Sequence, residues 1–101
     1  MKRLKRGKTI IGEIVLYQNA NMRGAHRHVF NNESDLRNHE DPTFNDAVSS
    51  FVIIRGVWKL YRDGNYRNAY DGEFGPGTYE RTDSYGVRND EMSSLKCIRL
   101  R

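Results

Sequence analysis

Short apolar segments separated by turn-forming residues run along most of this chain. The clearest four cover residues 13–17, 51–54, 57–61 and 95–100 and are rich in β-branched and aromatic side chains. Such segments are typical of β-strands. Clusters of Asn, Gly and Pro lie between them, and no segment has a helical apolar period over ten residues or more. The pattern therefore predicts an all-β protein in which short strands form an antiparallel sandwich.

Polar and apolar residues of the chain repeat with a fixed offset. NDAVSS at residues 45–50 returns 44 residues later as NDEMSS at residues 89–94. The same offset superposes Leu16 on Leu60, Tyr17 on Tyr61, Asn21 on Asn65, Arg23 on Arg67, Phe30 on Phe74, and Ile54-Arg55 on Ile98-Arg99. A fixed period of this length indicates a repeated supersecondary unit. We therefore predict two copies, over about residues 13–56 and 57–101, each with the size of one four-stranded Greek key.

The positive charge of the chain is concentrated at its start. The 101 residues suffice for one small domain and carry a formal net charge of +4. Five Lys and Arg residues lie within residues 2–8, so the remainder of the chain is near −1. Residues 1–12 are therefore predicted to be a flexible basic tail, and residues 13–101 the folded domain. A basic tail can also attract nucleic acid or an anionic surface, which stays an alternative function.

Targeting signals and cysteines add little to this picture. No apolar stretch approaches the roughly 18 residues of a membrane span. The basic start is not followed by the apolar segment of a signal peptide. We therefore expect a cytoplasmic location by default, and a monomer or weak dimer. Cys97 is the only cysteine, so an internal disulfide is excluded.

Two motifs give the chain a resemblance to a known family. One is NDxxSS in each repeat. The other consists of an aromatic residue, four residues, a second aromatic residue, one residue and glycine, and it is nearly matched at residues 17–24 and 61–68. Met22 replaces the second aromatic residue, and Asn68 replaces the glycine, where positive φ is expected and asparagine tolerates it. Over about residues 13–100 the chain resembles the calcium-binding βγ-crystallin domains of microbes and invertebrates.

This resemblance implies two calcium ions per chain, bound reciprocally by the two loops. Each loop would give one site a backbone carbonyl and a serine hydroxyl, and would send its aspartate to the other site. Carried over by position, the first site would use the carbonyls of Gln18 and Ala47, the hydroxyl of Ser49 and the carboxylate of Asp90. The second site would use the carbonyls of Arg62 and Glu91, the hydroxyl of Ser93 and the carboxylate of Asp46. Water would complete both coordination shells.

The charges beside each ion set the expected affinity. With one carboxylate per site, dissociation constants of about 10⁻⁵–10⁻³ M are expected, at the weak end of protein calcium sites. An Arg62 side chain that pointed inward would weaken the second site by like-charge repulsion, whereas Glu91 would strengthen it. Calcium bound to the native state alone would also stabilise the fold.

Other chemistry has less support in the sequence. A single NDxxSS segment would favour a simple turn, but the duplicated pair of oxygen-rich loops favours calcium. His26 and His28 share one face of a strand, but a structural zinc site needs four ligands, so surface histidines are expected. The serines lack a nucleophile-elbow setting and the histidines are not repeated, so we predict no enzyme and no small-molecule substrate. The six tyrosines could stack on nucleobases, but three of them lie at repeat-defined or strand positions where burial explains them. The core is therefore the preferred interpretation, and nucleic acid is not the expected partner.

Overall fold

The computed structural model describes residues 12–36, 48–88 and 91–100, which form short strands and 3-10 turns. The strands are β1 (Glu13–Asn19), β2 (Arg23–Val29), β3 (Ser50–Arg55), β4 (Val57–Asp63), β5 (Arg67–Ala69), β6 (Gly77–Tyr79) and β7 (Ser94–Arg99). The 3-10 turns η1 (Ala20–Met22) and η4 (Thr82–Tyr85) follow β1 and β6. In the described part of the chain, no helix has the length and apolar character required to cross a bilayer.

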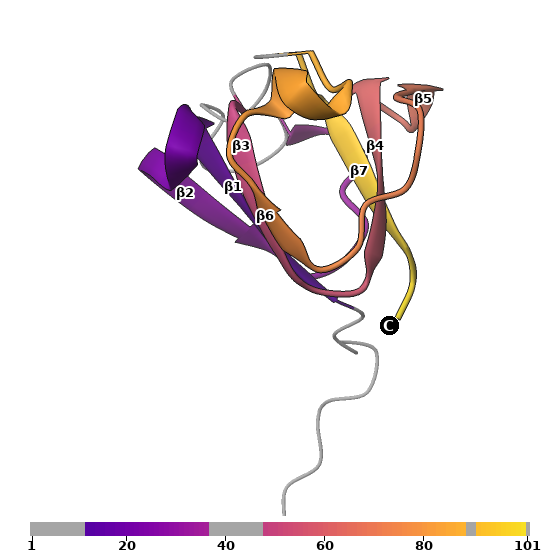
Figure 1. The fold of residues 1–101 in the computed structure, drawn as a ribbon. Coiled ribbons are helices and arrows are strands. Elements are labelled where there is room, and N and C mark those ends of the chain that lie inside the picture. Colours follow the sequence, from indigo (N-terminus) through magenta and orange to yellow (C-terminus); the bar gives the residue numbers. More distant parts are fainter. Residues whose placement is uncertain (1–11, 37–47, 89–90, 101) are drawn as a thin grey trace, which may run out of the picture.

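The strands form two antiparallel sheets that pack against each other (Figure 1). One sheet has the strand order β2-β1-β3-β6, and the other has the order β5-β4-β7. Outside these strands, Glu33 forms an antiparallel bridge with Leu95 of β7, on the side away from β4. Each half of the chain therefore supplies three strands to one sheet and an edge segment to the other. The predicted all-β antiparallel sandwich of two Greek keys is confirmed.

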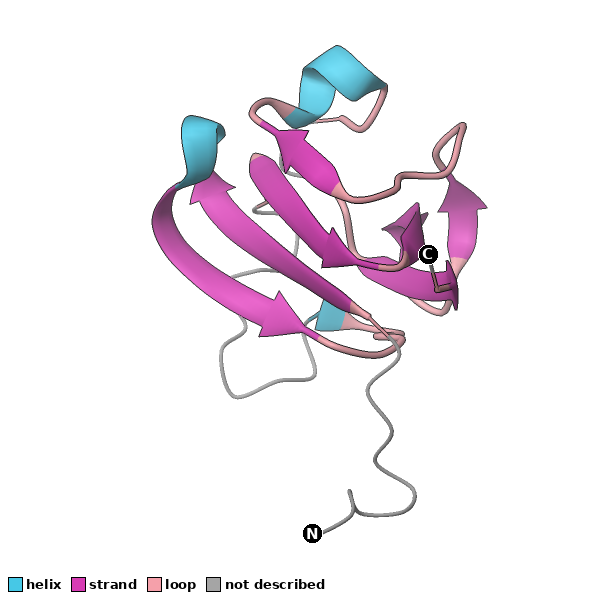
Figure 2. Ribbon diagram, turned by 60° about the horizontal axis from the view of Figure 1, so that its bottom comes forward, coloured by secondary structure: helices cyan, strands magenta, loops and turns pink. Residues whose placement is uncertain are grey.

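The two halves pair their strands in the same register. Tyr17 on β1 lies opposite Ser50 on β3, and Tyr61 on β4 lies opposite Ser94 on β7. Equivalent turns consequently reach the same end of the sandwich, where Figure 1 shows η1, η4 and the hairpin between β4 and β5. Figure 2, in which η1 and η4 are cyan, shows the same placement of these two turns. The two NDxxSS segments lead into β3 and β7. The starts of these two strands therefore lie at the end of the sandwich that carries the turns.

The core fills the space between the sheets and is almost entirely apolar. Its largest fully buried side chains are Trp58, Phe51, Ile14, Leu16, Leu36, Ile53, Leu60, Met92, Leu95, Val48 and Val87. Removing this apolar surface from water is the main favourable contribution to folding. Val48 and Met92 belong to the NDxxSS segments, so the core itself anchors the end of each loop.

The tyrosines correct one expectation, because none of the six is fully buried. Tyr17, Tyr61 and Tyr66 are half-buried, and the rings of Tyr61 and Tyr66 meet edge to face with centroids 5.6 Å apart. Tyr70 and Tyr79 only border the core. A phenol hydroxyl needs water or a hydrogen-bond partner, so the rings lie at the margin of the apolar interior.

Candidate metal centre

The last three residues of each NDxxSS segment occupy three different environments. They are Val48-Ser49-Ser50 in the first half and Met92-Ser93-Ser94 in the second half. The first residue of each triplet is fully buried in the core, the second is 8% and 9% exposed, and the third is 0% exposed. The Ser49 N–H donates to the Tyr17 carbonyl at 2.9 Å, and the Ser93 N–H donates to the Tyr61 carbonyl at 3.1 Å. The middle serine of each triplet is thereby fixed against the end of the neighbouring strand.

The third residue of each triplet fastens the hairpin beside it. The Ser50 hydroxyl donates to the Asn19 carbonyl at 2.6 Å and accepts from the Met22 N–H at 2.9 Å. In the second half, the Ser94 hydroxyl donates to the Asp63 carbonyl at 2.5 Å and accepts a hydrogen bond of 3.1 Å. That second donor is the N–H of Tyr66. Ser50 and Ser94 therefore use their hydroxyls for structure, which leaves Ser49 and Ser93 as the candidate ligands.

The first pocket contains the described part of the first predicted site. It has a volume of about 370 Å³ and is lined by Gln18, Asn19, Ala20, Ser49, Arg81, Thr82 and Asp83. The predicted ligands Gln18 and Ser49 therefore lie together, from β1 and from the residue before β3. Thr82 and Asp83 come from the other half of the chain. The Thr82 hydroxyl oxygen is buried and has no hydrogen-bond partner among the described residues.

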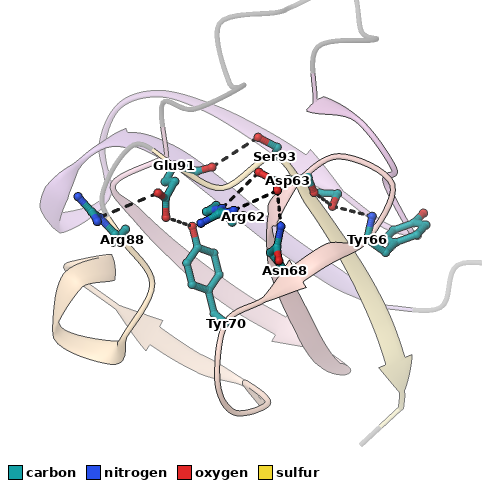
Figure 3. A network of polar contacts seen from close by, with 9 residues as sticks. Arg62, Asp63, Tyr66, Asn68, Tyr70, Arg88, Glu91 and Ser93 are labelled. Atoms are coloured by element: carbon teal, nitrogen blue, oxygen red, sulfur yellow. Dashed lines mark hydrogen bonds and ion pairs between the residues drawn. The ribbon is translucent and has the colours of Figure 1, made fainter.

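The second pocket lies beside β4 and is lined by two of the ligands predicted for the second site, Arg62 and Glu91. It has a volume of about 330 Å³ and is lined by Arg62, Asn68, Ala69, Tyr70, Gly86, Arg88 and Glu91. Ser93 lies next to this group, and its hydroxyl donates to the Glu91 carbonyl at 3.4 Å (Figure 3). Arg62, Glu91 and Ser93 therefore lie close together.

Side-chain charges around the second pocket are already paired (Figure 3). Nε of Arg62 lies 3.3 Å from Oδ1 of Asp63, and the Asn68 amide also donates to Asp63. These hydrogen bonds, first from Arg62 and then from Asn68, lower the pKa of the Asp63 carboxyl. Oε1 of Glu91 accepts from the Tyr70 hydroxyl at 2.7 Å, and Oε2 lies 4.0 Å from Nε of Arg88. Arg62 is therefore near the second site, as expected, but its charge is partly neutralised by Asp63.

Three of the predicted ligands lie outside the described residues, namely Asp46, Ala47 and Asp90. The described residues contain no group of three or more His, Cys, Asp and Glu side chains arranged to hold a metal. Sequence reasoning missed Asp83, Asp63 and Tyr70. Asp63 follows Arg62 directly and could have been considered as its partner. Asp83 reaches the first pocket only because β6 joins the sheet of the other half, which no local sequence pattern indicates.

Comparison with known proteins agrees with this architecture. The beta/gamma crystallin family model matches residues 13–98. A beta/gamma-crystallin from Ciona intestinalis is 31% identical over 86 residues, which cover 85% of this chain and 98% of the relative. The solved structure of beta gamma crystallin from Ciona intestinalis has a TM-score of 0.77 at 32% identity, covering 85% of this chain and 99% of that chain.

An archaeal structure is also similar. The crystal structure of a transition-metal-ion-binding βγ-crystallin from Methanosaeta thermophila has a TM-score of 0.73 at 40% identity, covering 83% of this chain and 98% of that chain. The fold and the paired serine loops define a domain built from two interlocked Greek keys. The chain belongs to the beta/gamma crystallin family.

Proposed function

We propose that this protein is a non-enzymatic calcium-binding domain that holds two calcium ions through its paired NDxxSS loops. The observation that carries the proposal is a pair of pockets, with Gln18 and Ser49 lining one and Arg62, the repeat counterpart of Gln18, and Glu91 lining the other. The four residues were predicted as ligands from the sequence, two for each site. Because the two residues predicted for each site line the same pocket, the structure supports their assignment as calcium ligands.

The donors in both pockets suit a hard cation. Calcium takes six to eight oxygen ligands at about 2.3–2.6 Å, so neighbouring ligands in its shell are about 3 Å apart. The Ser93 hydroxyl and the Glu91 carbonyl oxygen, 3.4 Å apart, have a spacing compatible with neighbouring ligands. In the first pocket, the buried Thr82 hydroxyl has no hydrogen-bond partner among the described residues and could meet a bound ion or its water. Both sites can therefore supply oxygen atoms without rearrangement of the core.

Calcium bound in the first pocket would have a structural role. The first pocket is lined by Gln18 and Ser49 from one half of the chain and by Thr82 and Asp83 from the other. An ion in this pocket would connect two strands of one Greek key with the edge segment of the second. Because such an ion binds only the folded protein, it would stabilise the native state. The archaeal neighbour described as transition-metal-ion-binding supports metal binding by this fold.

Calorimetric titration of the whole chain with calcium tests the proposal. Wild type is expected to bind two ions, and Ser49→Arg and Ser93→Arg are each expected to bind one. Arginine removes a hydroxyl ligand and places a positive charge against the ion. Thr78→Arg, on the exposed part of β6, makes a comparable change outside both pockets and should keep two sites. Two sites in either serine variant would show that the serines are not ligands.

Thermal unfolding supplies a second measure of calcium binding. At a hundredfold excess over the dissociation constant, each ion is expected to add about 2.7 kcal/mol to the free energy of unfolding. The melting temperature should therefore rise between chelator and about 10 mM calcium, a concentration above the weak affinities expected. An unchanged melting temperature, together with no calorimetric signal, would exclude calcium binding.

The basic residues within 2–8 motivate a second candidate function, binding to nucleic acid or an anionic surface. These residues lie outside the described part of the chain. Salt-dependent retention on DNA that disappears when residues 1–8 are removed would favour this function. Retention that does not depend on these residues, or no retention, would exclude it.

A further inference from the structure

Two histidines lie side by side on the exposed face of β2. His26 is paired across the strands with Tyr17, and His28 is paired with Val15. The two imidazole rings have centroids 5.5 Å apart and meet edge to face at 74°. Both side chains are exposed, and neither lines either of the two pockets.

Glu13 holds one of these imidazoles in a defined state. Nδ1 of His28 lies 2.8 Å from Oε2 of Glu13. An ionised carboxylate can only accept a hydrogen bond, so Nδ1 carries the proton and Nε2 of the neutral ring keeps its lone pair. A carboxylate bonded to the far nitrogen of a histidine is the usual outer-shell arrangement at protein metal sites, where it orients the ring and raises its basicity.

The ring spacing fits a shared metal ion. With a metal–nitrogen distance of about 2.0–2.1 Å, the ion lies about 3.2 Å from each ring centroid, and two imidazoles at the tetrahedral angle have centroids about 5.2 Å apart. The observed separation of 5.5 Å is within a few tenths of an ångström of that value. The centroid separation is therefore compatible with two imidazoles that bind one ion, once the rings turn from their edge-to-face arrangement.

Aromatic neighbours restrict both imidazoles from the outside. The Tyr17 ring lies 5.7 Å from the His26 ring, and the Phe30 ring stacks on the His28 ring at 6.0 Å and 13°. Side chains restricted in this way lose less conformational freedom when they bind a ligand. The pair is therefore partly organised before a metal arrives.

We propose that His26 and His28 form a binding site for a divalent transition-metal ion such as Ni²⁺, Cu²⁺ or Zn²⁺, with Glu13 as the positioning residue of His28. Imidazole nitrogen suits these ions, whereas calcium selects oxygen, so the site is independent of the two calcium sites. Two protein ligands leave the remaining positions to water. The site is therefore an exchangeable surface site with two protein ligands. It differs from a structural zinc site, which needs four protein ligands and is not expected from the sequence.

The test is calorimetric titration of the whole, tag-free chain with Ni²⁺ in saturating calcium. Wild type is expected to bind one Ni²⁺. His26→Asn and His28→Asn should each weaken this binding more than about a hundredfold, because loss of an outer-shell partner alone weakens metal binding by about 10- to 100-fold. His39→Asn removes the remaining histidine and should leave Ni²⁺ binding unchanged. Unchanged calcium titrations and circular dichroism would show that the variants are folded. Wild-type affinity in His26→Asn or His28→Asn, or its loss in His39→Asn, would overturn the proposal.

Two further measurements test the named roles. Glu13→Gln is expected to weaken Ni²⁺ binding about tenfold with calcium binding unchanged, because the charged outer-shell partner is lost. Glu73→Gln, which removes a carboxylate paired with Arg99 elsewhere on the surface, should have no effect on Ni²⁺. In Cu²⁺-loaded wild type, electron paramagnetic resonance should show coupling to two imidazole nitrogens, and to one in His26→Asn. Coupling to two nitrogens in that variant would rule out His26 as a ligand.

Discussion

Neighbouring serines in each NDxxSS segment have different tasks. Ser49 and Ser93 are buried beside the two pockets, whereas Ser50 and Ser94 each donate one hydrogen bond and accept another within the adjacent hairpin. The hairpin bonds hold two residues with positive φ, Met22 at 56° and Tyr66 at 57°, by their backbone N–H groups. Because these backbone conformations are sparsely populated, they need support from surrounding bonds. The second serine of the motif supplies that support.

We predict that Ser50→Ala and Ser94→Ala lower the free energy of unfolding by about 1–3 kcal/mol each, because each substitution removes two part-buried hydrogen bonds, one from a backbone N–H and one to a backbone carbonyl. Urea unfolding in calcium-free buffer measures the effect. Ser84→Ala, at an exposed position of η4, should change the stability by less than about 0.5 kcal/mol. Calcium titration of both destabilised variants should still give two sites. A loss of sites with normal stability would mean that these hydroxyls bind the ion.

Single positions also show what sequence can specify. Asn68 has φ of 57° where Gly24, its counterpart in the first half, has φ of 82°, so the expected left-handed conformation at Asn68 is confirmed. That prediction depended only on local backbone sterics. The tyrosine prediction was wrong because burial of a ring depends on the packing of distant strands, which a local pattern does not contain.

At the scale of elements, apolar pattern determined which strands could be predicted. The segments over residues 13–17, 51–54, 57–61 and 95–100 correspond to β1, β3, β4 and β7, which carry most of the buried side chains. The short strands β5 and β6 have few or no buried residues, so hydrophobicity does not mark them. Their positions follow from strand pairing, and β6 pairs with β3 of the other half. The repeat indicates two units, but it does not indicate that they exchange edge segments.

This exchange makes the two proposed sites unequal. Asp83 follows β6 and lines the first pocket together with Arg81, while Arg62, Arg88 and Glu91 line the second. We predict that Asp83→Asn weakens calcium binding at the first site roughly five- to tenfold, because an exposed carboxylate near a cation contributes about 1 kcal/mol or somewhat more. The measurement is a calcium titration in the Ser93→Arg background, which leaves only the first site.

Asp71→Asn is the matched control for this prediction. Asp71 is an exposed aspartate outside both pockets, so its neutralisation should leave the affinity of the first site unchanged. Equal weakening by both substitutions would indicate a general effect of net charge. No weakening by Asp83→Asn would place its carboxylate outside the coordination and field of the ion.

At the scale of the whole molecule, the two proposed sites belong to one interlocked unit. Each sheet takes an edge segment from the other half, and each pocket lies beside a serine that directly precedes a strand, Ser49 before β3 and Ser93 before β7. Five of the eight ligands predicted from the sequence are described, and they lie beside the two pockets. All eight stay predictions as calcium ligands, and Asp46, Ala47 and Asp90 lie outside the described residues.

The reciprocal use of the two aspartates is the prediction that joins the halves most directly. If each loop sends its aspartate to the other ion, Asp46→Ala should impair the site that contains Ser93, and Asp90→Ala the site that contains Ser49. Combined variants separate this arrangement from independent loops. Asp46→Ala with Ser93→Arg should leave one working calcium site, since both changes affect the same ion. Asp46→Ala with Ser49→Arg should leave none. Calorimetry that shows the reverse pattern would mean that each Greek key binds its own ion, and that the interlocked sheets do not share their carboxylates.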